Sequence, residues 1–89
     1  MAIGAQSVGI AKVMTAGQNL NVKVGQGAML GISCSVAGSM SVYDDPATGT
    51  TTPLGLAIVL ATGWNPFPVT FATGLNVALT TAAGTVVYL

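Results

Sequence analysis

Hydrophobic and polar residues alternate one by one along most of this chain. In residues 19–24, Leu20, Val22 and Val24 fall on one face and polar residues on the other, which is the period of a half-buried β-strand. The same period is found in three further segments, and it predicts which side chains of each face inward. They are Leu30, Ile32, Cys34 and Val36 in 28–36, Met40 and Val42 in 39–43, and Leu54, Leu56, Ile58 and Leu60 in 53–61. Further strands are expected at 9–14, 69–72, 74–80 and 85–89. The pattern predicts an all-β fold, a small β-sandwich or barrel of about eight short antiparallel strands.

Clusters of Gly, Pro, Asp and Thr separate these strands. Residues 44–49 are predicted to form a loop between two strands of an edge or hairpin, 62–68 a proline-rich corner, and 81–84 a hairpin turn. With 89 residues the chain has room for a single domain, 1–89. Residues 1–8 are expected to be either a frayed terminus or an N-terminal arm that lies on a neighbouring subunit.

Charged residues make up 4% of the chain and hydrophobic residues 52%, whereas about a quarter of an average soluble domain is charged. The longest apolar run, 54–61, is too short for a membrane helix, so we expect no membrane partner. Residues 1–7 lack the pattern of a signal peptide, which predicts synthesis in a cytoplasm. A lone core of this size is only marginally stable, so we expect copies of the chain to associate.

The chain offers few groups for chemistry, and we expect neither an enzyme nor a cofactor or metal site. It contains no His, and its only acids are Asp44 and Asp45. Both are interpreted as turn residues that Asn could replace with little loss, with calcium ligation as the alternative. Cys34 is expected to be a buried, inert thiol. Two lysines are too few for nucleic-acid binding.

Contact surface is what remains, and Trp64, Pro66 and Phe67 are predicted to form an interface, because aromatic anchors on a rigid backbone are favoured at interface centres. The alternative is that Phe67 and Phe71 close the end of the sandwich. A carbohydrate-binding site that uses Trp64, Tyr43 and Asp44 is a more distant hypothesis.

Several segments of the C-terminal half together resemble small β-rich structural proteins of tailed bacteriophage particles. They are a Tyr-Asp turn at 42–45, a Phe-Pro corner at 66–68, a Thr-Gly-Leu strand at 72–77 and a final Val-Val-Tyr strand at 84–88. Proteins of this kind look like capsid decoration (cement) proteins or modules of head or tail fibres and necks. The resemblance covers about half of the chain and carries no catalytic residue.

This resemblance implies a virion protein made in the host cytoplasm that binds the major capsid protein or another virion protein. It also implies a homotrimer or another symmetric group seated on an assembled shell, and we expect a trimer. The alternative is an attachment module of a fibre or neck.

Overall fold

The computed structural model describes residues 10–89, so the predicted arm, 1–8, lies outside the described residues. Eight strands follow one another: β1 (Ile10–Met14), β2 (Asn19–Val24), β3 (Gly27–Val36), β4 (Gly38–Asp44), β5 (Pro53–Leu60), β6 (Gly63–Phe71), β7 (Gly74–Thr80) and β8 (Ala83–Tyr88). All strand pairs are antiparallel. The predicted all-β fold is confirmed. Within the described range, no helix is long and apolar enough to span a membrane.

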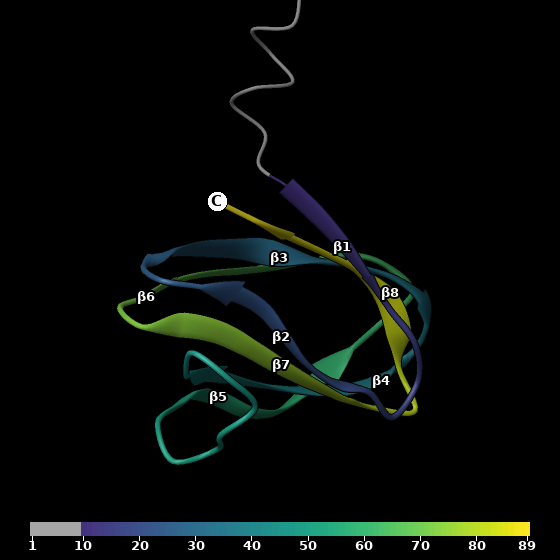
Figure 1. Ribbon diagram of the computed structural model, residues 1–89. Helices are drawn as coiled ribbons and strands as arrows, with labels where there is room; N and C mark the ends of the chain where they lie inside the picture. The colour runs from purple at the N-terminus through teal and green to yellow at the C-terminus, as the bar shows by residue number, and fades with distance from the viewer. Residues whose placement is uncertain (1–9) are drawn as a thin grey trace, which may run out of the picture.

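The strands form two four-stranded sheets that face each other (Figure 1). Sheet A has the order β1-β8-β3-β6, and sheet B has the order β2-β7-β4-β5. The architecture is therefore a sandwich. Its edge strands are β1 and β6 in sheet A, and β2 and β5 in sheet B.

The strand pairs are nested. The pair β4-β5 is a hairpin, and β3-β6, β2-β7 and β1-β8 follow outward from it. This is the order that results when one long hairpin is rolled over itself, which is the jelly-roll topology. The loop predicted at 44–49, between two strands of an edge or hairpin, joins the two strands of a hairpin, β4 and β5. The predicted hairpin at 81–84 is wrong, because β7 lies in sheet B and β8 in sheet A.

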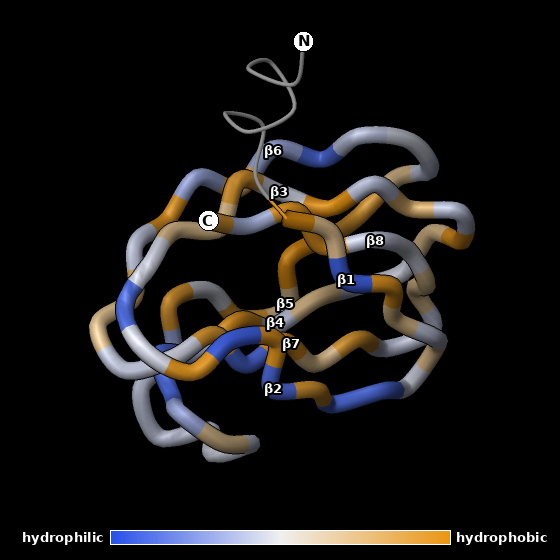
Figure 2. The backbone as a smooth tube through the Cα atoms, turned by 45° about the horizontal axis from the view of Figure 1, so that its top comes forward, coloured by the Kyte–Doolittle hydropathy of each residue, from blue (hydrophilic) through white to orange (hydrophobic). Residues whose placement is uncertain are grey.

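The hydrophobic core draws its residues from both sheets. Strongly hydrophilic stretches of the chain are few and short (Figure 2). The core residues are Met14, Met29, Ile32, Cys34, Met40, Val42, Leu60, Phe71, Leu75, Val77, Leu79, Ala82 and Val86. Every strand except β2 contributes at least one residue to this core. Leu20 and Val22 of β2, and Leu54 and Ile58 of β5, pack against this core from the edges.

Irregular register corrects several predicted faces. In β3, an extra residue relative to β8 between Met29 and Gly31 buries Met29 in place of Leu30, while Ile32 and Cys34 point inward as predicted. A single extra residue moves all preceding side chains to the other face. Shifts also expose three side chains predicted to be inward: Val24, Val36 and Leu56.

Strand β6 corrects a predicted loop. The sequence places 62–68 in a proline-rich corner, but Gly63–Phe71 is one continuous strand. Pro66 and Pro68 are tolerated because β6 is an edge strand, where a missing N–H group need not break a hydrogen bond to a second neighbour.

Candidate interaction surface

Trp64 and Pro66 lie on the outer face of sheet A. Trp64 is directly opposite Ser33 in β3, and its side chain is 52% exposed. The indole ring extends over Gly31, where an added Cβ atom would lie 2.8 Å from Cζ2 and Cη2 of Trp64. Gly31 therefore provides the flat floor against which the ring rests, and half of the ring faces solvent.

Phe67 points the other way, into the sandwich. It is partly buried against the core, and a Cβ atom at Gly55 of β5 would lie 2.8 Å from Cζ of Phe67. The ring thus closes the space between edge strands β5 and β6. Of the three residues predicted for the interface, the structure brings Trp64 and Pro66 together on the surface and places Phe67 inside. Phe67 and the buried Phe71 correspond to the alternative in which aromatic rings close the sandwich.

The outer face of sheet A is uncharged across its described strands. Strand alternation and register place the following residues on it: Ala11, Val13, Gly31, Ser33, Ser35, Trp64, Pro66, Pro68, Thr85 and Val87. An open depression of about 280 Å³ lies beside Val13, Ser33, Ser35 and Thr85. This face offers apolar contact and hydroxyl groups, but no ionised group.

The carboxylate of Asp44 binds the turn between β6 and β7. Its oxygens accept hydrogen bonds from the N–H groups of Ala72 (2.8 Å), Thr73 (2.8 Å) and Gly74 (3.3 Å) and from the Thr73 hydroxyl (2.8 Å). The backbone donors of Ala72 and Thr73 are the main reason why the pKa of Asp44 falls to about 2. Asp44 therefore ties the end of β4 to the turn that leads into its neighbour in sheet B, β7.

Asp45 organises the loop between β4 and β5. Its Oδ1 accepts hydrogen bonds from the N–H groups of Ala47 (2.8 Å) and Gly49 (3.1 Å). The loop folds back over the outer face of sheet B, where the Asn76 amide donates to the Gly49 carbonyl (2.9 Å) and the Asn21 amide donates to the Asp45 carbonyl (3.3 Å). Asn76 is fully buried by this cover.

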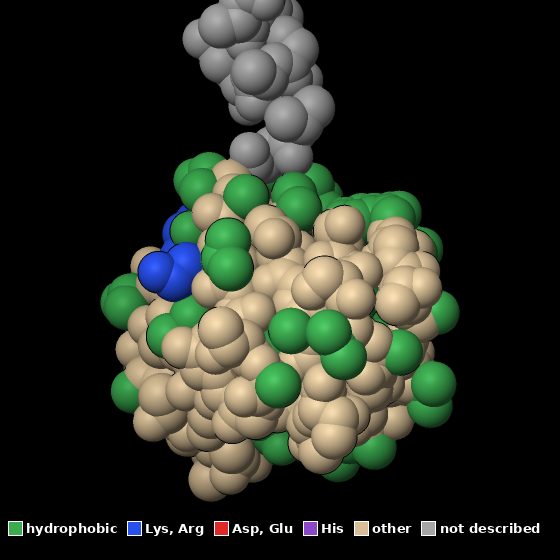
Figure 3. Space-filling view, turned by 90° about the vertical axis from the view of Figure 1, so that its right-hand side faces the viewer, with side chains coloured by type: hydrophobic (Ala, Val, Ile, Leu, Met, Phe, Trp, Pro, Cys, Tyr) green, Lys and Arg blue, Asp and Glu red, His purple; other side chains and the backbone are tan. Residues whose placement is uncertain are grey.

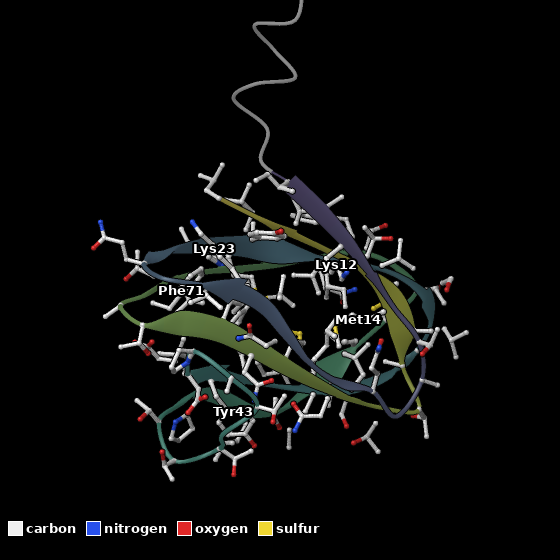
Figure 4. The ribbon with its side chains drawn as sticks, viewed as in Figure 1. Lys12, Met14, Lys23, Tyr43 and Phe71 are labelled. Carbon is white, nitrogen blue, oxygen red and sulfur yellow. The ribbon has the colours of Figure 1, made fainter. Side chains whose placement is uncertain are left out.

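The two lysines differ in their surroundings. Lys23 donates a hydrogen bond to the carbonyl of Leu89 (3.2 Å), and in Figure 4 its side chain rises from β2 toward sheet A. Lys12 is exposed and makes no hydrogen bond with another described residue. Figure 3, which views the molecule from the right-hand side of Figure 1, displays lysine atoms at one margin, no acidic side chain, and scattered hydrophobic groups.

No constellation for metal binding is found among the described residues. Cys34 is buried, as predicted, and burial raises the pKa of its thiol. The residues of the carbohydrate hypothesis are not brought together. Trp64 lies on the outer face of sheet A, whereas Tyr43 lies on sheet B (Figure 4) and the Asp44 carboxylate is occupied by the β6-β7 turn.

Sequence reasoning did not identify Val13, Ser33, Ser35 and Thr85 as neighbours on one surface. They come from three strands that meet only through the pairing of β8 with both β1 and β3. Their one available signal was the outward position of small and hydroxyl side chains in β3.

No protein-family model, no curated protein and no solved structure matches this chain.

Proposed function

We propose that this chain is a structural protein of a tailed-phage particle, a capsid decoration (cement) protein that binds and stabilises the assembled shell through protein contacts. The contact surface is the outer face of sheet A, centred on Trp64 and Pro66. The partner is the major capsid protein or another virion protein, and the protein resides in the virion after synthesis in the host cytoplasm. Neither catalysis nor a cofactor has a part in this role.

One observation carries the proposal: three of the four charged residues are engaged within the chain, and an uncharged sheet face presents a half-exposed Trp. Asp44, Asp45 and Lys23 all hydrogen-bond to groups of the chain itself. A surface with so few available charges is poorly suited to a free protein. Large aromatic residues with depleted charge are typical of the centre of a protein interface.

The fold supports the same role at a coarser level. Jelly rolls with eight strands occur in viral capsid domains, and also in lectins and cupins. Fold alone does not determine function, so the argument depends on the surface. Ligand chemistry in lectins uses converging polar side chains, and Trp64 lies on a different sheet from Tyr43 and Asp44.

Trp64→Ala tests the proposal directly. Truncating a central aromatic anchor typically costs about 2 kcal/mol of binding free energy or more, so affinity for purified shells should fall by about 30-fold. Thermal unfolding should change little, because half of the ring is already in solvent. Val59→Ala is the matched control, since Val59 is exposed on β5 of sheet B, and its binding should equal that of the unmodified chain.

Normal binding by Trp64→Ala would contradict the proposed surface. Imaging of the intact particle tests the location. Density over the capsid lattice supports a cement protein, whereas density only at a vertex, neck or tail tip supports the alternative, an attachment module.

A further inference from the structure

The four edge strands of the sandwich are protected to very different degrees. Exposed edges present unpaired N–H and C=O groups to which a further strand can add, and proteins usually block them with prolines, bulges or charges. In sheet A, β6 is blocked by Pro66 and Pro68. In sheet B, β2 is interrupted by a register shift between Asn21 and Lys23.

Strand β5 is blocked in two ways. Its register against β4 shifts on both sides of Val42, and Ala57 has a φ of 50°, which bends the strand locally. The N–H group of Ala57 also donates a hydrogen bond to the hydroxyl oxygen of Ser41 (3.1 Å). An incoming strand would therefore meet no regular row of donors and acceptors along β5.

Strand β1 carries neither a proline nor a register shift, and its one charged residue is Lys12. All five residues, Ile10–Met14, pair with β8 in unbroken register, and among the described strands β8 is the only partner of β1. Ile10 is 56% exposed and Val13 is 71% exposed, so the edge is apolar as well as regular. Its single charge, Lys12, alternates to the side opposite Val13.

We propose that β1 is the edge at which two copies of this chain join, antiparallel about a two-fold axis, so that their A sheets form one eight-stranded sheet. This dimer takes the place of the trimer that the resemblance led us to expect. Backbone hydrogen bonds across such an edge supply affinity without any charged group. The inference does not depend on what the protein binds, because β1 and the Trp64 strand β6 are the opposite edges of sheet A.

The residues of β1 favour a second copy as the occupant. Side chains directly opposite in a sheet share a face, and like charges directly opposite are destabilising. An alignment centred on Lys12 would place two ammonium groups against each other. An alignment centred on Val13 instead places Val13 against its symmetry mate and Lys12 beside Met14, so the outer faces of both copies continue without a charge.

Two lysine variants test this edge. We expect the unmodified chain to run as a dimer in sedimentation at micromolar concentration. In Val13→Lys, two ammonium groups face each other across the axis, so the dimer should weaken at least tenfold while circular dichroism is unchanged. Val59→Lys is the matched control, because Val59 is 86% exposed on the blocked strand β5, and it should remain a dimer.

Cysteine variants test the alignment. Val13→Cys should form a disulfide with its own mate under mild oxidation, because directly opposite Cα atoms lie within disulfide range. Ala11→Cys and Val59→Cys should not, and the native Cys34 is buried. The proposal would be overturned if the unmodified chain were a monomer or a trimer, or if Val13→Lys left the dimer intact. It would also be overturned if Ala11→Cys cross-linked and Val13→Cys did not.

The two tests are independent. If Trp64→Ala loses shell binding but still forms the dimer, the result bears on the proposed function and not on the β1 edge.

Discussion

At the scale of single residues, Asp44 links the acid response of the protein to its fold. The pKa of its carboxyl falls from 3.8 to about 2 because backbone N–H groups of Ala72 and Thr73 bind the ionised form. A group whose pKa is lowered by folding stabilises the folded state when it is ionised. That stabilisation is complete above about pH 4 and is lost as the pH falls toward 2.

Asp44→Asn is therefore predicted to lower the thermal midpoint at pH 7, because one neutral amide oxygen replaces a carboxylate that accepts four hydrogen bonds. The difference from the unmodified chain should shrink as the pH falls through about 4 to 2, because the native carboxyl becomes protonated. Thermal unfolding followed across this range measures the effect. This revises our sequence-based expectation that Asn replaces Asp44 with little loss.

Asp45→Asn is the control for that measurement. Asp45 uses a single oxygen, Oδ1, to accept both of its hydrogen bonds, and the Oδ1 atom of Asn can accept the same two. The original expectation therefore stands for this residue. If the deficit of Asp44→Asn stayed constant down to pH 2, the carboxylate would not be the group that stabilises the β6-β7 turn.

At the scale of elements, the loop between β4 and β5 depends on the buried amide of Asn76. Asn76→Ala removes its hydrogen bond to Gly49, and a hydrogen bond of this kind contributes about 1 kcal/mol. We expect a loss near that value and no more, because Asn76 Oδ1 is buried without a partner among the described residues. Hydrogen exchange should speed up at the Gly49 amide and remain slow in the core of β7.

Thr80→Ala is the matched control for the loop, since Thr80 lies on the same side of β7 as Asn76 but is exposed. Exchange at Gly49 should be unaffected by it. Unchanged protection of Gly49 in Asn76→Ala would mean that Asp45 and Asn21 hold the loop without help from β7.

Element positions could be predicted from alternation, but the faces of bulged strands could not. In β4, Met40 and Val42 are inward as predicted, since its pairing with β7 is regular. In β3 and β5, register shifts reverse the faces of Leu30 and Leu56. Gly31 and Gly55 lie at these shifts, and a glycine within a strand is a signal of a bulge that alternation alone does not use. Periodicity reports local geometry, whereas a bulge depends on the partner strand.

The candidate surface was predictable only in part for a related reason. Trp64 and Pro66 were identified by residue type, but their position on a flat strand over Gly31 depends on the pairing of β3 with β6, far apart in the sequence. Phe67, their neighbour, points inward because β6 is a strand and not a loop. The nested strand order that joins Val13 to the same face carries no local signal.

At the scale of the whole molecule, the distribution of charge sets the kind of binding that is available. The formal net charge is zero, and Asp44, Asp45 and Lys23 are occupied by groups of the chain. Long-range steering and ion pairing are consequently weak, whereas burial of Trp64 and contact with hydroxyl groups of sheet A remain. Ionic strength should act on such an interface mainly through the hydrophobic effect.

Binding to the shell is therefore predicted to change less than about twofold between about 50 mM and 500 mM sodium chloride, since screening has few charge pairs to weaken. Sulfate should strengthen binding, because excluded salts favour burial of apolar surface. Titration of purified shells at several salt concentrations measures both effects.

Lys12→Gln is the control variant. It removes the one exposed lysine without a hydrogen bond to another described residue and should leave the salt response unchanged. A tenfold or steeper loss of affinity with sodium chloride that disappears in Lys12→Gln would mean that Lys12 pairs with an acidic group of the shell, and that contact would then involve the β1 edge as well as Trp64.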